Sequence, residues 1–147
     1  MSMIDVTAKP EVYREAKAKG TIKLKSETIR LIREGKVEKG DPFEVAKVAG
    51  ILAAKNTSSL IPLCHPLPLT GVEVKLQIVD DSKVEVETTV KTRAQTGVEM
   101  EALAATATAL LTVWDMTKQY EKDKNGQYPH TSIQDVHVVR KVKEKRT

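Results

Sequence analysis

Residues 72–90 read VEVKLQIVDDSKVEVETTV, and this stretch decides the fold. Apolar and polar side chains alternate on both sides of Asp80-Asp81-Ser82, which is typical of two half-buried strands joined by a turn. Such a pair predicts an antiparallel hairpin with one face on the core and the other in water.

A long helix is predicted after this hairpin. Residues 96–99 (TGVE) have the spacing of a capping box, in which Thr96 would cap the helix. The apolar side chains that follow recur at helical spacing and predict the buried face, which consists of Met100, Leu103, Ala107, Leu110, Leu111 and Trp114. The helix is expected to end near Asn125-Gly126, and a last strand should contain Ile133, Val136, Val138 and Val139.

One strand and two helices are predicted ahead of the hairpin. Residues 21–25 alternate as a short strand, and Ser26 has the character of an N-cap for a helix that Gly35 closes. Asp41 and Pro42 begin a second helix, as N-cap and first helical residue. The apolar face of that helix is expected to contain Val45, Val48, Ala49 and Leu52.

The predicted order is therefore strand, helix, hairpin, helix, strand. This order is typical of an α+β ferredoxin-like sandwich, an antiparallel sheet packed on helices, here with one extra helix near the N-terminus. No repeat, low-complexity segment or linker composition divides the chain, so residues 1–147 are expected to form a single domain.

Composition narrows the class of protein. With 40% hydrophobic and 30% charged residues, the chain has the balance of an ordinary globular protein. No apolar run approaches the roughly 18 residues of a membrane span, and the start MSMID lacks the regions of a signal peptide, so a cytoplasmic location is expected. A single cysteine, Cys64, allows no internal disulfide, and without a cysteine or histidine cluster no metal site is predicted.

The net charge of +4 comes from the end of the chain, because residues 140–147 hold five basic side chains against Glu144. The rest is neutral overall, which favours a solvated basic tail over a nucleic-acid-binding face. Aromatic residues make up only 3%, too few for base-stacking platforms. The alternative, a nucleic-acid accessory protein that works through the tail, would show binding that weakens steeply with salt.

Residues 60–69 read LIPLCHPLPL and predict a rigid loop. Each proline fixes its own backbone and restricts the residue before it, so His65, which precedes Pro66, has little freedom. Either the loop presents His65 to a ligand, or its leucines line a core and His65 is a hydrogen-bonded bystander. The residues alone leave both readings open.

Candidate acids and bases lie elsewhere. The chain has no glycine-rich phosphate loop, so a phosphate would be held by side chains or helix N-termini. Lys39 precedes the capped helix start at Asp41, where it could reinforce anion binding or simply be a solvated loop lysine. Asp115 and Lys118 share a helix face and form either an acid/base pair or an exposed ion pair.

Two acids begin the long helix. Capping and the helix dipole explain Glu99, whereas Glu101 has no capping role. Glu101 lies about 21 Å along the helix from Asp115, too far for both to grip one reacting atom. If both are functional, the site forms between subunits or spans a long ligand. No chemistry is assigned to His130 or His137.

Taken together, the motifs resemble the C-protein family of molybdenum cofactor biosynthesis, the cyclic pyranopterin monophosphate synthases. The resemblance extends from Ile4 to about Lys141 and rests on residues 39–41 (KGD), 63–67 (LCHPL), 96–103 (TGVEMEAL) and 114–118 (WDMTK). It implies a phosphorus–oxygen lyase that converts (8S)-3′,8-cyclo-7,8-dihydroguanosine 5′-triphosphate to cyclic pyranopterin monophosphate and diphosphate. It also implies a homohexamer, a trimer of dimers, with sites at subunit interfaces.

The resemblance implies residue roles as well. Lys39 and Lys118 become the catalytic lysines, with Asp115 as acid/base beside Lys118. Substrate binding is implied for Leu63, Cys64, His65, Glu99, Met100 and Glu101, and contact with the triphosphate for Arg14, Lys55 and Lys141. No dedicated cofactor or metal is implied, although a divalent ion could accompany the triphosphate.

Two departures from the family pattern stand out. The chain ends in a VKEKR run where some members have a glycine- and lysine-rich tail, and Lys25 stands where arginine is common. A non-catalytic, nucleotide-binding regulatory module of the same fold is the alternative function, and it would bind the substrate without releasing diphosphate.

Overall fold

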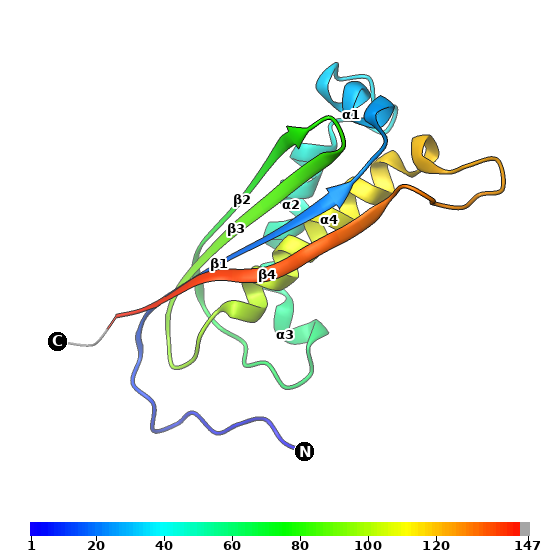
Figure 1. Ribbon diagram of the computed structural model, residues 1–147. Coiled ribbons are helices and arrows are strands. Elements are labelled where there is room, and N and C mark those ends of the chain that lie inside the picture. The colour runs from blue at the N-terminus through cyan, green and yellow to red at the C-terminus, as the bar shows by residue number, and fades with distance from the viewer. Residues whose placement is uncertain (145–147) are drawn as a thin grey trace.

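The computed structural model describes residues 1–144. Its elements are β1 (Val12–Lys23), α1 (Ser26–Arg33), α2 (Pro42–Lys55), α3 (Thr57–Leu60), β2 (Leu69–Asp80), β3 (Lys83–Ala94), α4 (Glu99–Glu121) and β4 (Ser132–Lys143). The strands form one antiparallel sheet in the order β2-β3-β1-β4. Figure 1 shows α2 and α4 on one face of this sheet. The predicted α+β class is confirmed, and the strand order matches the ferredoxin-like topology.

The hairpin of β2 and β3 is confirmed. Ile78 lies opposite Val84 and Val72 opposite Val90, so the alternating valines share the face beneath the helices. The turn is fixed by Asp80, whose carboxylate accepts the N–H of Ser82 at 2.8 Å. The other face of the sheet bears charged side chains in ion pairs, such as Lys17 with Glu87 at 3.3 Å. The sheet therefore has one wet and one dry face.

The first strand is longer than predicted, since β1 begins at Val12 and not at Thr21. Its inward positions are small and buried, at Ala16, Ala18 and Gly20, and such residues give little apolar signal. They let α4 lie close to the sheet. A Cβ on Gly20 would stand 2.8 Å from a methyl carbon of Leu110.

Only one of the three predicted N-caps is confirmed. Asp41 caps α2 by accepting the N–H of Phe43 at 2.9 Å. Ser26 is the first residue of α1, after Lys25 at the cap position, and α4 begins behind Val98 with no side-chain cap, so the proposals for Ser26 and Thr96 were wrong. At α1 a distant carboxylate replaces the local cap, because Glu121 accepts the N–H of Lys25 at 3.0 Å.

The predicted buried face of α4 was only partly right, since Leu110 belongs to the core and Leu103 and Trp114 pack against it. Met100 and Leu111 are exposed, and of the six apolar residues expected there only Leu110 is fully buried. The side that packs inward consists mainly of small residues, together with two acids: Glu101, Ala102, Ala105, Thr106, Ala109, Leu110, Val113, Met116, Thr117 and Glu121. Small side chains bring the backbone close to the sheet, so the contact face is not the most apolar one.

The helix α2 shows the same effect. It packs inward through Ala46, Gly50, Ala53 and Ala54, and a Cβ on Gly50 would stand 3.0 Å from Val74. Of the predicted face, Ala49 is half-buried and the larger side chains are in water. We call the exposed set the α2 apolar face, and it consists of Val45, Val48, Ile51 and Leu52.

The end of the chain forms the edge strand β4. Helix α4 stops at Glu121, ahead of the turn at Gly126, and β4 contains all four residues predicted for the last strand. Of the predicted basic tail, residues 140–143 belong to β4, and residues 145–147 lie outside the described residues. Within residues 1–144, none of the helices is long and apolar enough to cross a membrane.

Candidate active site

Asp115 lies between the ammonium groups of two lysines. Lys118 Nζ is 3.1 Å from Asp115 Oδ1, and Lys39 Nζ is 3.6 Å from Oδ2. Lys39 Nζ also donates to the backbone carbonyl of Asp115 at 2.9 Å. The hydrogen bond from Lys118, and then the charge of Lys39, hold the pKa of Asp115 below its usual value. We call these three residues the lysine–aspartate cluster.

Two elements build the cluster. Asp115 and Lys118 face the same way because they are one helical turn apart near the end of α4. Lys39 comes from the loop between α1 and α2, where Gly35 and Gly40 adopt φ values of 69° and 121° that side chains disfavour. The side chains are 40% to 61% exposed, so a ligand can reach them directly.

A hollow of about 310 Å³ lies at the other end of α4. It is lined by six residues that the sequence predicted for substrate binding, Leu63, Cys64, His65, Glu99, Met100 and Glu101. We call it the α4 hollow. The proline-rich loop thus lies beside the start of α4, with His65 among the residues that line the hollow.

The two acids of the α4 hollow, Glu101 and Glu99, differ in burial and in their charged neighbours. Glu101 is only 4% exposed, and this burial, with the neighbouring Glu99 carboxylate, raises its pKa. Glu99 is exposed enough to pair with Lys141 at 3.3 Å. Burial, and then Glu101, raise the pKa of the Cys64 thiol, so Cys64 is not an activated nucleophile. The hollow thus offers one buried acid with a raised pKa beside one carboxylate in an ion pair.

His65 is held by the N-terminal segment. Its Nε2 lies 2.6 Å from the carbonyl oxygen of Ile4, and because a carbonyl can only accept, Nε2 is the donor. Ile4, Val6 and Lys9 line the α4 hollow as well, and none of the three was predicted as a site residue. No local signal could have found them, because the contact joins residues that are 61 positions apart.

Two of the predicted phosphate contacts lie outside both groups. Arg14 is buried, and its guanidinium donates to the carbonyls of Ala94 and Gln95, each at 3.2 Å. It therefore holds the end of β3 in place. Lys55 is exposed in the last turn of α2 and does not line the α4 hollow. Lys141 reaches the hollow through its pair with Glu99.

The cluster and the hollow lie at opposite ends of α4. From Glu101 to Asp115 the helix rises about 21 Å. In Figure 1 the end of α4 that carries the cluster lies near α1, and the end that carries the hollow lies near α3. Each chain thus presents two separate groups of predicted site residues.

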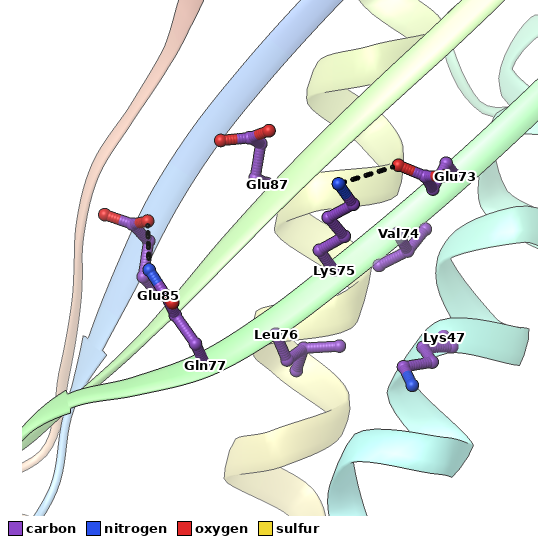
Figure 2. Close-up of a pocket in the computed structure, with 8 residues that line it drawn as sticks. All are labelled: Lys47, Glu73, Val74, Lys75, Leu76, Gln77, Glu85 and Glu87. Atoms are coloured by element: carbon purple, nitrogen blue, oxygen red, sulfur yellow. Dashed lines mark hydrogen bonds and ion pairs between the residues drawn. The ribbon is translucent and has the colours of Figure 1, made fainter.

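A larger hollow of about 530 Å³ runs along the edge strand β2, away from both groups (Figure 2). Its polar side chains are engaged with one another, as in Lys75 with Glu73 and Gln77 with Glu85, both at 3.2 Å. Lys47 reaches its rim from α2. We assign no chemistry to this surface. In the described part of the chain, no three histidine, cysteine or acidic side chains are grouped to hold a metal ion.

Comparison with known proteins gives one consistent result. The model of the MoaC family matches residues 3–144. A probable cyclic pyranopterin monophosphate synthase of Pyrococcus furiosus is 54% identical over 147 residues, which cover 100% of this chain and 94% of that protein. Proteins of the same name from Saccharolobus solfataricus and Sulfurisphaera tokodaii are 54% and 55% identical, over 97% and 96% of this chain and 95% and 93% of theirs.

Proposed function

This chain belongs to the MoaC family, and we propose that it converts (8S)-3′,8-cyclo-7,8-dihydroguanosine 5′-triphosphate to cyclic pyranopterin monophosphate and diphosphate. It is an enzyme, a lyase of molybdenum cofactor biosynthesis. The observation that carries the proposed reaction is the placement of Asp115 between Lys39 and Lys118.

The reaction has two parts. The purine-derived ring is opened and rebuilt as a pterin, and a substrate hydroxyl attacks the α-phosphorus, forming one P–O bond while the bond to the leaving diphosphate breaks. Both parts move protons, and the second gathers negative charge on the diphosphate. The two cations keep the Asp115 carboxylate ionised, so it has a free lone pair for a proton, and the two ammonium groups can donate protons and neutralise charge. We assign these roles to Asp115, Lys39 and Lys118.

The α4 hollow is the proposed site for the rest of the substrate. Its volume suits a small ligand, and Glu101 and His65 place polar groups among the apolar side chains of Leu63 and Met100. Lys141 is the best placed of the three proposed triphosphate contacts, because it lies beside Glu99 at the rim. Arg14 and Lys55 stay predictions.

We further propose a homohexamer, a trimer of dimers, in which one subunit's cluster faces another's α4 hollow. The separation of about 21 Å along α4 supports this arrangement, because it keeps the two groups of one chain apart. The exposed α2 apolar face supports it too, because four large apolar side chains on one helix are suited to a subunit contact. Sedimentation equilibrium tests the proposal, and a monomer at working concentration would refute it.

We propose no dedicated cofactor. A divalent ion would enter with the triphosphate, as such ions commonly do, and turnover with and without a chelator tests this. The proposed location is the cytoplasm.

A coupled assay tests the reaction. The cyclised nucleotide is generated in situ, and diphosphate and pterin are followed for the wild type, Lys39→Ala and Asp115→Ala. Lys36→Ala is a matched control, since Lys36 lies in the same loop and pairs only loosely with Glu34, at 4.0 Å. Turnover by the wild type and the control, with loss in both site variants, is expected. Tight binding of the nucleotide without diphosphate release would instead favour the regulatory-module alternative.

A further inference from the structure

The loop that carries Lys39 is tied to the last turns of α4 by two side chains outside the lysine–aspartate cluster. The hydroxyl oxygen of Tyr120 accepts the backbone N–H of Glu38 at 2.8 Å. Gln119 Nε2 donates to the Glu38 carboxylate at 2.9 Å. Glu38 immediately precedes Lys39, so both contacts fix the backbone from which the Lys39 side chain extends.

The other hydrogen bonds of this loop shape it without attaching its backbone to α4. Gly40 N–H donates to Val37 O at 3.1 Å, and Lys36 N–H donates to Leu31 O at 2.9 Å, so both are local. Two residues with positive φ, Gly35 and Gly40, frame the segment and give it conformational freedom. Val37 is buried and anchors the middle of the loop. The Glu38 N–H is then the main-chain point at which α4 sets the position of Lys39.

From this geometry we infer that Tyr120 is a positioning residue for Lys39, acting through the backbone of Glu38. The inference rests on the proposed function for its catalytic consequence. Proton transfer and charge neutralisation depend on placement to within about 1 Å. Asp115 and Tyr120 belong to the same stretch of helix, so the hydroxyl fixes the loop in the frame that also carries the carboxylate.

A positioning role and a purely structural role for Tyr120 predict different behaviour of the Tyr120→Phe variant. Glu38 is exposed, so water can take the place of the hydroxyl as acceptor when Tyr120→Phe removes it. The loop should therefore open more often while the fold as a whole stays equally stable. A residue needed only for structure would instead lower the stability of the whole chain.

The test compares Tyr120→Phe with Tyr128→Phe. Tyr128 packs edge-on against Trp114, with ring centroids 5.2 Å apart, and its hydroxyl makes no hydrogen bond within residues 1–144. The first readout is hydrogen exchange of the Glu38 amide by NMR. It is expected to rise about three- to tenfold in Tyr120→Phe and to stay at the wild-type rate in the control, since a net hydrogen bond corresponds to such a factor.

The second readout is turnover of the cyclised nucleotide. The expected result for Tyr120→Phe is a fall in kcat of about three- to tenfold with an unchanged KM and an unchanged thermal midpoint. Equal kcat in the two tyrosine variants would overturn the inference, and so would a fall in kcat that follows a general loss of stability. Gln119→Ala leaves the Glu38 N–H acceptor in place and should have the smaller effect; a larger one would also overturn the assignment to the hydroxyl.

The two readouts separate this inference from the proposed function. If the wild type releases no diphosphate, the proposed function fails and the catalytic consequence fails with it. The Glu38 exchange rate still decides whether the hydroxyl holds the loop. If the wild type turns over and only the positioning effect is missing, the proposed function stands and the role of Tyr120 is refuted.

Discussion

Lys39 and Asp115 meet across 76 positions of sequence, with the ammonium group bound to both the backbone carbonyl and the side chain of the aspartate. Lys39 therefore contacts both the backbone of α4 and the charged carboxylate of Asp115. Because Lys118 holds the other oxygen, the ionised form of Asp115 is favoured from two directions. The pH response of this carboxylate is the most direct probe of the cluster.

We predict that Lys118→Met raises the pKa of Asp115 toward its usual value, and by more than Lys39→Met does, because the hydrogen bond from Lys118 is the largest cause of the lowered pKa. The measurement is a pH titration of the Asp115 carboxyl carbon by NMR. Lys122→Met, at an exposed lysine immediately after α4, is the control and should leave the titration unchanged. A larger effect from Lys39→Met would contradict this reading of the cluster.

The lowered pKa of Asp115 also determines in which direction its contribution to stability changes with pH. A carboxyl whose pKa is lower in the folded state stabilises the fold above its unfolded pKa, and this contribution disappears as the pH falls through the folded value. Since the Asp115 side chain is 61% exposed, the contribution is expected to be small.

Glu101 should behave in the opposite sense. Burial raises its pKa in the folded state, so its carboxyl favours folding in acid, and this advantage is lost as the pH rises from the unfolded value through the folded one. We predict that Glu101→Gln unfolds with a flatter pH dependence than the wild type over the pH range above the ordinary glutamate pKa of about 4.3. Urea unfolding across this range measures it. Glu34→Gln, at an exposed loop position, should keep the wild-type slope.

The sequence predicted the parts of this protein whose signals are local. Alternation over residues 72–90 was sufficient for the hairpin, and Asp41 followed by Pro42 was sufficient for the start of α2. The lysine–aspartate cluster was predicted in its members, partly by resemblance, and the structure adds that they meet. These features depend on residues that are neighbours in the sequence or on short sequence motifs.

The rest depends on contacts that sequence patterns do not contain. Small residues such as Ala105 and Gly50 define the packed faces of α4 and α2, so a search for large apolar side chains identified these faces only in part. Glu121 is fully buried and accepts hydrogen bonds from Lys25, Thr28 and Thr131, although a glutamate near a helix end looks solvated. The hydrogen bond between His65 and the backbone of Ile4 was likewise not predictable from a sequence pattern.

Thr88 offers a test of core packing. Its hydroxyl is buried and has no hydrogen-bond partner within residues 1–144. Replacing it with valine keeps the shape and removes an unsatisfied polar atom, so Thr88→Val should raise the free energy of unfolding by about 1 kcal/mol. Thr92→Val is the matched control on the same strand, because the Thr92 hydroxyl donates to the carbonyl of Pro68 at 2.7 Å.

Thr92→Val removes a hydroxyl that is hydrogen-bonded, so it should lower the free energy of unfolding by about 1 kcal/mol. The same substitution, threonine to valine, is therefore expected to change the free energy of unfolding in opposite directions at the two positions. Urea unfolding at one fixed protein concentration measures both, since association would otherwise alter the apparent stability. Equal changes in the two variants would refute the claim that the Thr88 hydroxyl is unsatisfied.

The α2 apolar face gives the last prediction. Val48 is 58% exposed at its centre, whereas Ala46 on the opposite side of the helix is fully buried. If this face is a subunit contact, Val48→Glu places a charge in an apolar interface and should lower the mass seen by sedimentation equilibrium while the fold, followed by circular dichroism, persists. Glu73→Lys, a charge reversal at an exposed site on β2, is the control. Because the proposed sites combine groups from different subunits, Val48→Glu should also lose diphosphate release in proportion to the lost assembly. Unchanged mass with unchanged turnover would exclude this face from the active assembly.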